Sequence, residues 1–204
     1  MNFKFKTYRH NQPIHFHFNR RIKVGILGGS FNPAHEGHLH IRFIAKKHLN
    51  LDEIWWLVTP QNPLKISKPA TYEERLQNCK QITKNFPIKI LEVEKKIKSQ
   101  YSYQTIKFLI QYYKNIKFFW LMGADNLVNF HEWEKWQSIF HIISIVIFRR
   151  HGYNTNALKS VAAKKFIHHK YIAQDIEHVS KKIPAWTLIQ NKEIKISSSE
   201  IRNQ

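Results

Sequence analysis

Short apolar runs rich in branched and aromatic residues alternate with longer segments of helical periodicity from residue 21 onward, and this alternation restricts the possible folds most. The runs expected to form strands are 22–27, 54–59, 88–93, 117–122, 142–148 and 185–190. The segments expected to form helices are 38–49, 72–84, 103–113 and 156–168. Such alternation is typical of α/β domains with a mostly parallel sheet. Ligands of these sheets bind beyond the carboxyl ends of the strands, so we examine the loops that follow strands.

The first 20 residues differ in character from the rest of the chain. Residues 1–20 are polar and aromatic without clear periodicity, and we expect them to form an extension before a domain of residues 21–204. The 204 residues are 43% apolar and contain neither an internal repeat nor a linker, which predicts one domain. Apolar stretches such as 142–148 are far shorter than the roughly 20 residues that span a bilayer, and the N-terminus lacks a signal-peptide core. A cytoplasmic protein outside the membrane is therefore expected.

The formal net charge of +19 favours anionic partners. A basic nucleic-acid-binding module is one interpretation, because clustered Lys and Arg neutralise phosphates. The excess is mostly lysine spread along the chain without a lysine-rich run, and a general bias towards lysine explains it better than a nucleic-acid role does. We expect small anionic substrates and no nucleic acid.

The first expected strand runs directly into a glycine-containing segment, Gly28-Gly29-Ser30-Phe31-Asn32-Pro33-Ala34-His35-Glu36-Gly37-His38. Its glycines permit close backbone approach, and the helix that follows offers N–H groups and a positive dipole end to an anion. The segment has neither the Gly-Lys-Ser/Thr of a Walker A loop nor the Gly-x-Gly-x-x-Gly of dinucleotide-binding folds. It therefore predicts a phosphate site of another kind.

Two histidines of this segment, His35 and His38, are three residues apart. If the helix begins near Gly37, both imidazoles lie on one side of its first turn and face one phosphate. Together with His40 they are alternatively a metal site, for which the sequence offers no further ligand cluster. We expect phosphate binding by the two imidazoles and no metal bound by the protein.

The pattern Gly-x-Phe-Asn-Pro-x-His-x-Gly-His resembles the signature of the nucleotidyltransferase superfamily with the His-x-Gly-His motif. The resemblance implies a single Rossmann-like, doubly wound α/β domain. It also implies that His35 and His38 are catalytic and stabilise charge as a substrate phosphate attacks the α-phosphorus of a nucleoside triphosphate. In this segment it assigns Asn32 to the mononucleotide and the following residues to ATP: Gly28, Gly29, Ser30, Phe31, His35 and His38.

A second segment suited to anions, Ile196-Ser197-Ser198-Ser199-Glu200-Ile201-Arg202, follows the last expected strand. Ser197 and Glu200 match a capping box, so hydroxyls, helix N–H groups and a guanidinium converge there. Alone, the pattern also fits a capped terminal helix with a solvated Arg. It resembles the Ile-Ser-Ser-Thr/Ser-x-Ile-Arg signature of the pyridine-nucleotide adenylyltransferases. That resemblance implies ATP binding by Ser197, Ser198 and Arg202, and a catalytic role for Arg202.

Between these segments, Met122-Gly123-Ala124-Asp125-Asn126-Leu127 follows the fourth expected strand. An acid after Gly at a strand end is placed to accept from ribose hydroxyls, so Gly123 and Asp125 are expected at the ATP site. Further on, Trp133 or Trp136 is placed to stack on a flat heterocycle, although Trp in such a run is more often a core residue. Both segments resemble the bacterial nicotinate-mononucleotide branch, which has Gly-x-Asp-x-Leu and then Phe-x-x-Trp-x-x-Trp. This resemblance implies that Trp133 stacks on the nicotinate ring.

Three smaller matches extend the resemblance over nearly all of the chain from residue 22. Pro60-Gln61-Asn62-Pro63-Leu64-Lys65 resembles a strand-end loop that puts Lys65 near substrate phosphates. Tyr101-Ser102-Tyr103-Gln104-Thr105 resembles a Tyr-Thr-x-Asp-Thr segment that holds the pyridine nucleotide, with Ser102 for Thr and Gln104 for Asp. Arg149-Arg150-His151-Gly152-Tyr153 resembles an Arg-Pro-Gly-Tyr turn with His151 for Pro, and Arg150 is expected to bind the mononucleotide phosphate.

Together these matches imply adenylyl transfer from ATP to nicotinate mononucleotide, giving deamido-NAD and pyrophosphate in NAD biosynthesis. A phosphate oxygen is already a nucleophile at neutral pH, so direct in-line displacement needs alignment and charge dispersal and no covalent intermediate. Mg²⁺ is expected to arrive with ATP, held largely by phosphates and water. The first motif alone also fits an adenylyl- or cytidylyltransferase acting on phosphopantetheine or a phospho-alcohol.

Overall fold

The computed structural model describes residues 21–59, 70–93, 97, 99, 101–176, 183–192, 196 and 198–202. The expected extension, residues 1–20, lies outside the described residues, as do Lys65 and Ser197.

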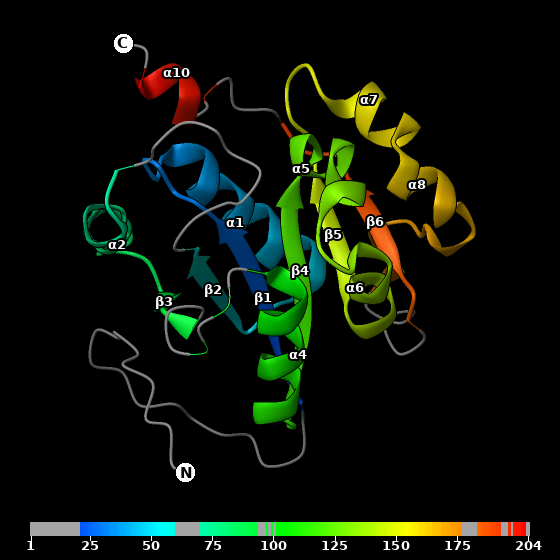
Figure 1. Ribbon diagram of the computed structural model, residues 1–204, viewed down its shortest axis with the longest axis horizontal. Helices are drawn as coiled ribbons and strands as arrows, with labels where there is room; N and C mark the ends of the chain where they lie inside the picture. The colour runs from blue at the N-terminus through cyan, green and yellow to red at the C-terminus, as the bar shows by residue number, and fades with distance from the viewer. Residues whose placement is uncertain are drawn as a thin grey trace.

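A sheet of six parallel strands forms the centre of the domain (Figure 1). The strands are β1 (Ile22–Gly29), β2 (Glu53–Val58), β3 (Ile88–Leu91), β4 (Ile116–Gly123), β5 (Ser144–Phe148) and β6 (Trp186–Ile189). Each overlaps one of the expected runs, so the predicted α/β class and the parallel sheet are confirmed. The strand order is β3-β2-β1-β4-β5-β6, the doubly wound arrangement that the resemblance implied.

Helices cover both faces of the sheet, with α1 behind it and α4 and α6 in front in Figure 1. The described helices are α1 (Glu36–Leu49), α2 (Tyr72–Ile82), α4 (Ser102–Tyr112), α5 (Ala124–Val128), α6 (Trp136–Ile142), α7 (Asn154–Lys159), α8 (Val161–Lys165) and α10 (Ser198–Arg202), with short 3₁₀ turns η1 (Phe130–Glu132) and η2 (Ile167–His169). Among these, no helix is long and apolar enough to cross a membrane.

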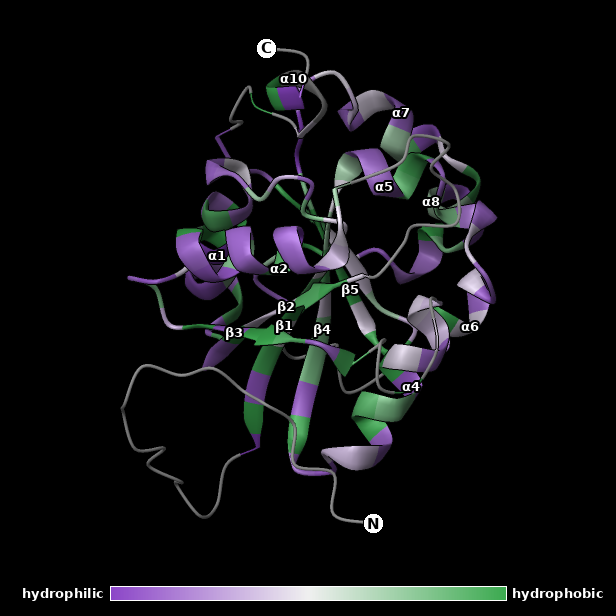
Figure 2. Ribbon diagram, turned by 60° about the vertical axis from the view of Figure 1, so that its left-hand side comes forward, coloured by the Kyte–Doolittle hydropathy of each residue, from purple (hydrophilic) through white to green (hydrophobic). Residues whose placement is uncertain are grey.

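Two apolar clusters fill the space between the sheet and its helices. Neighbouring residues of a strand point to opposite faces, so Ile26 packs in the cluster that includes Ile106 of α4. Leu27 packs in the other cluster, with Leu39 of α1 and Cys79 of α2. Because both faces are covered, the strands are largely apolar, and Figure 2 shows them mostly in green and white with short purple sections.

The expected helix over 156–168 is wrong in its detail, because the structure divides this segment into α7, α8 and η2. Ser160 interrupts it with an extended conformation (φ −62°, ψ 157°), and its Oγ accepts a hydrogen bond from the Ala163 N–H at 3.2 Å. Ser is a favourable N-cap and a poor helix-interior residue, so the chain begins a new helix there.

The single cysteine, Cys79, is fully buried in α2 and packs in the apolar cluster on that face of the sheet. Burial raises the pKa of its thiol to about 12. Because the thiolate is the reactive form, we expect an aromatic disulfide reagent at pH 8 to modify Cys79 far more slowly in the native protein than in urea. Absorbance of the released thiolate measures both rates, and equal rates would contradict the packing assignment.

The strand order reverses between β1 and β4, which are neighbours in the sheet. From β1 the chain continues outward to β2 and β3, whereas from β4 it continues outward to β5 and β6. The loops after Gly29 and after Gly123 therefore diverge at one point of the carboxyl edge. This is where open α/β sheets bind their ligands.

Candidate active site

The two histidines of the first motif cap helix α1 reciprocally. The Gly37 N–H donates to His35 Nδ1 at 3.1 Å, and the His35 N–H donates to His38 Nδ1 at 3.2 Å. The centroids of the two rings lie 4.0 Å apart. The expectation that both imidazoles lie on one side of the first turn is confirmed, although α1 begins at Glu36 and not at His38.

This capping arrangement also determines the tautomer of each neutral imidazole. Both Nδ1 atoms accept backbone N–H groups, so the ring proton of each residue is on Nε2. His35 and His38 thereby present Nε2–H groups at the start of α1. Donors of this kind suit phosphate oxygens.

Gly37 makes the arrangement possible, a requirement that the sequence reasoning did not identify. A Cβ at this position would lie 2.8 Å from His35 Cε1 and 2.9 Å from His35 Nδ1. Any side chain at residue 37 would therefore push the His35 ring off its capping position.

Phe31 lies beneath the histidines as a buried support. Its ring stacks on Trp56 at 4.8 Å and contacts the His38 ring at 4.8 Å. Its backbone adopts a left-handed conformation (φ 46°), which is uncommon for a bulky residue and reverses the chain after β1. The whole residue is only 1% exposed, so Phe31 supports the histidines from within the core.

The two glycines of the motif leave room for aromatic rings. A Cβ on Gly28 would lie 2.5 Å from the Trp120 ring, and one on Gly29 would lie 3.3 Å from Phe31. The Trp120 ring in turn meets Trp133 edge to face, with centroids 6.4 Å apart. An aromatic path therefore connects the two glycines at the end of β1 with Trp133, the tryptophan expected to bind the nicotinate ring.

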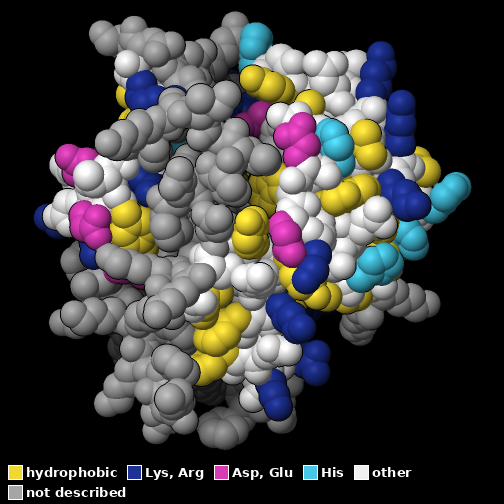
Figure 3. Space-filling view, viewed as in Figure 1, with side chains coloured by type: hydrophobic (Ala, Val, Ile, Leu, Met, Phe, Trp, Pro, Cys, Tyr) yellow, Lys and Arg dark blue, Asp and Glu magenta, His cyan; other side chains and the backbone are white. Residues whose placement is uncertain are grey.

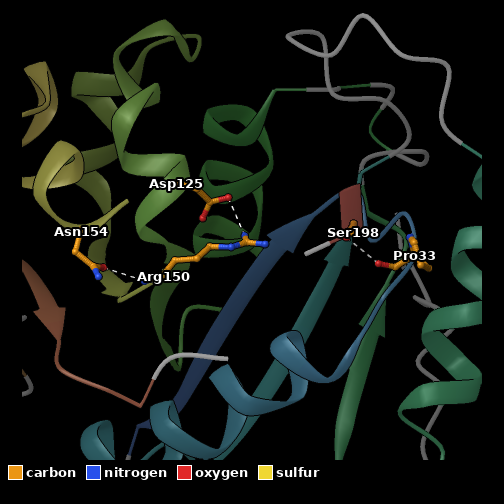
Figure 4. A network of polar contacts seen from close by, with 5 residues as sticks. All are labelled: Pro33, Asp125, Arg150, Asn154 and Ser198. Atoms are coloured by element: carbon orange, nitrogen blue, oxygen red, sulfur yellow. Dashed lines mark hydrogen bonds and ion pairs between the residues drawn. The ribbon is translucent and has the colours of Figure 1, made fainter. Parts of the chain in front are cut away.

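Helix α10 brings the second motif, residues 196–202, into contact with the first, residues 28–38, which we call the histidine motif. Ser198 Oγ donates to the Pro33 carbonyl at 2.9 Å (Figure 4), and Arg202 Nη1 donates to the Asn32 carbonyl at 2.5 Å. Asn32 also accepts from the Ala70 N–H through Oδ1 at 3.2 Å. The two segments expected to bind ATP are thus joined at the carboxyl edge of the sheet, although they lie at opposite ends of the described chain.

Asp125 and Arg150 form an ion pair on the β4 side of this edge (Figure 4). Arg150 Nη1 donates to Asp125 Oδ2 at 2.8 Å, and Asn154 Oδ1 accepts from the Arg150 N–H at 2.9 Å. Asp125 Oδ1 is buried, and no described residue donates to it. A Cβ on Gly123 would overlap this oxygen, which explains the glycine.

The two candidate tryptophans have different surroundings. Trp133 follows η1 with an extended backbone and is half-buried. Its ring packs on Phe130, with the two ring centroids 4.9 Å apart. Trp136 packs at the start of α6 against Phe140 and Phe166, with centroids 6.4 Å and 6.0 Å away. Trp136 therefore belongs with core rings, whereas Trp133 borders the site through Trp120.

Ser102 is the first residue of α4. Nearby, Ser99 Oγ donates to Gln104 Oε1 at 2.5 Å and accepts from the Tyr101 N–H at 3.1 Å. No described hydrogen bond joins Ser102 to the histidine motif or to the Asp125 pair. Its assignment to the mononucleotide, like that of Lys65, remains a prediction.

Basic side chains gather on another part of the surface, over α7 and α8 (Figure 3). The exposed ones there include Lys159, Lys164, Lys165 and His168. His35, by contrast, is buried at the start of α1. The candidate phosphate site is therefore not part of the exposed basic face.

The described residues contain no group of three His, Cys, Asp or Glu side chains that could hold a metal ion. A metal cage built by His35, His38 and His40 does not fit this geometry, because His40 instead lies 2.8 Å from the Lys192 carbonyl.

A parallel sheet with paired imidazoles, a helix start and an arginine at its switch point defines a nucleotide-binding α/β protein of the nucleotidyltransferase class. Comparison with known proteins gives the family: residues 26–204 match the model of the cytidylyltransferase-like family, and the chain belongs to it. A protein of Ruegeria sp. (strain TM1040), named "Probable nicotinate-nucleotide adenylyltransferase", is 38% identical over 90% of this chain and 97% of its own length. A protein of the same name from Agrobacterium fabrum is 37% identical over 88% of this chain and 97% of its own length.

The structural comparison supports the same fold. The Plasmodium falciparum nicotinic acid mononucleotide adenylyltransferase complexed with NaAD aligns with a TM-score of 0.62 and 20% identity, covering 89% of this chain and 83% of that protein.

Proposed function

We propose that this protein transfers the adenylyl group of ATP to nicotinate mononucleotide, giving deamido-NAD and pyrophosphate in NAD biosynthesis. The observation that carries the proposal is the docking of α10 on the histidine motif, through Ser198 on Pro33 and Arg202 on Asn32. The names of the relatives, which match over nearly their whole length, support the acceptor. We assign the activity to residues 21–204, with 1–20 as an extension, and to the cytoplasm.

The reaction proceeds by direct displacement. An oxygen of the mononucleotide 5′-phosphate forms a bond to the α-phosphorus of ATP, while the bond from that phosphorus to the β-bridging oxygen breaks and pyrophosphate leaves. The Nε2–H donors of His35 and His38 stabilise charge on the α-phosphate oxygens. Arg202, at the end of α10, stabilises the departing pyrophosphate.

The remaining assignments follow the two halves of the carboxyl edge. Asp125 Oδ1, a buried acceptor without a described donor, suits a ribose hydroxyl of ATP. Arg150 shares its guanidinium with Asp125 and supplies further N–H donors to the mononucleotide phosphate. Mg²⁺ enters bound to ATP as part of the substrate. The other proposed contacts are Gly28, Gly29, Ser30, Phe31, Gly123, Ser197 and Ser198 for ATP, and Asn32, Lys65, Ser102 and Trp133 for the mononucleotide.

The direct test is pyrophosphate release by the purified protein with ATP and Mg²⁺. Nicotinate mononucleotide, nicotinamide mononucleotide and phosphopantetheine are compared as acceptors under the same conditions. We expect the fastest release with nicotinate mononucleotide. Release with phosphopantetheine alone would keep the nucleotidyltransferase class and reject the acceptor.

Replacing Trp133 with Ala is expected to weaken the binding of the mononucleotide by about tenfold or more, because stacking of a base on an aromatic ring contributes about 1–3 kcal/mol. Binding of ATP should change little. Separate titrations of the two substrates measure the ratio of the affinities, and Trp133→Phe, which keeps a flat ring, is the matched control. An unchanged ratio in Trp133→Ala would refute the stacking assignment.

A further inference from the structure

Arg75 of α2 is a buried arginine whose guanidinium bonds three backbone carbonyls. Its side chain is among the largest fully buried ones, and the residue is 2% exposed. Nη1 donates to the Ser30 carbonyl at 2.5 Å and to the Thr59 carbonyl at 2.8 Å, while Nε donates to the Ala70 carbonyl at 3.1 Å. Burial lowers the pKa of this guanidinium.

These three carbonyls come from the loops that build the candidate site. Ser30 lies between the glycines at the end of β1 and the histidine motif, and Thr59 directly follows β2. Ala70 precedes Thr71, the residue that caps α2. Thr59 and Ala70 also flank the segment 60–69, whose Lys65 is expected at the substrate phosphates. One planar group therefore fixes the carboxyl ends of two adjacent strands relative to each other.

Two asparagines complete the attachment of the same loops. Asn78 of α2 accepts from the Ala34 N–H through Oδ1 at 2.7 Å. Asn32 Oδ1 accepts from the Ala70 N–H at 3.2 Å. The chain between Ser30 and Ala34 is thus held against α2 at both ends, immediately before His35. A displacement at Ser30 would be passed on to the histidines because this stretch is short and is held at both ends.

We propose that Arg75 is a positioning residue for the adenylyl transfer: by bonding Ser30, Thr59 and Ala70 it holds the histidine motif in register with the end of β2 and the start of α2. This inference rests on the proposed function only where its test measures enzymatic activity. Arg75 acts through backbone carbonyls, so no contact with substrate is required. A misplacement of about 1 Å remote from the chemistry can lower a rate by about 10²-fold, which gives the scale of the effect.

The test compares Arg75→Met, which keeps the length and apolar stem, with Leu76→Ala, a buried position on the same helix. Both are measured at a temperature where circular dichroism shows a folded protein. We expect kcat to fall by about 10²-fold in Arg75→Met and to remain unchanged in Leu76→Ala, even if Leu76→Ala lowers Tm more. Arg75→Lys should give an intermediate kcat, because one ammonium cannot bond three carbonyls in a plane.

A second readout does not depend on the reaction. Amide hydrogen exchange of peptides covering residues 30–38 should accelerate in Arg75→Met and stay at the wild-type rate in Leu76→Ala. If the wild type uses another acceptor, the proposed function is wrong, and the kcat values of the variants are compared with that acceptor. If the wild type turns over no acceptor, the hydrogen-exchange rates alone test the role of Arg75. Should Arg75→Met not fold, Arg75→Lys carries both readouts. The proposal would be overturned if the Arg75 variant kept the wild-type kcat and exchange rate. It would also be overturned if Leu76→Ala changed kcat and exchange as much as the Arg75 variant does.

Discussion

Replacing His38 with Ala is expected to lower kcat by about 10²- to 10³-fold while the protein stays folded. The change removes one of the two Nε2–H donors that the capping geometry sets beside the start of α1. It also removes the side-chain acceptor of the His35 N–H, a hydrogen bond worth about 1 kcal/mol. The effect on turnover should therefore exceed the effect on stability by a wide margin.

Single-turnover and steady-state pyrophosphate release measure this loss, and thermal unfolding measures stability. His48→Ala is the matched control, because His48 is an exposed imidazole in the last turn of the same helix. We expect wild-type kcat in the control. Equal activity of His38→Ala and wild type would remove His38 from the mechanism.

Local patterns in the sequence predicted the elements of the fold well. The strands and the first three expected helices follow from periodicity, and the capping box of Thr71 and Glu74 is present at the start of α2. The segment 156–168 was mispredicted because Ser160 competes with helix continuation by capping α8, an effect that apolar periodicity does not report. The reciprocal cap of His35 and His38 was equally outside the usual rules, since histidine is not a favoured N-cap residue.

The parts of the site that the sequence could not predict are contacts between distant segments. Arg75 occupies a position in the buried stripe of α2 beside Leu76 and Cys79, and an arginine in such a stripe was the available signal. Its three carbonyl partners could not be identified, because each lies in a loop of a different strand or cap. The pairing of Arg150 with Asp125 was likewise unpredicted, since the two residues were assigned to different substrates.

Gly37→Ala is the second change for which we expect a large effect, because it should misplace an imidazole without removing it. The new Cβ would lie 2.8 Å from His35 Cε1, which is too close for both atoms to keep their places, and 3.3 Å from Ile196 Cγ2. The His35 ring must then leave its cap, which costs about 0.5–2 kcal/mol of stability. We expect kcat to fall by about 10²-fold, as for the loss of one charge-stabilising donor.

A double-mutant cycle separates this mechanism from a general distortion of α1. In a His35→Ala background the ring that collides with residue 37 is absent, so adding Gly37→Ala should lower kcat little further, and the two losses should be strongly non-additive. Glu36→Ala, an exposed change in the same turn, is the control for local effects on the helix start. Full additivity of the two losses would mean that residue 37 acts on turnover independently of His35, contrary to the collision that the geometry requires.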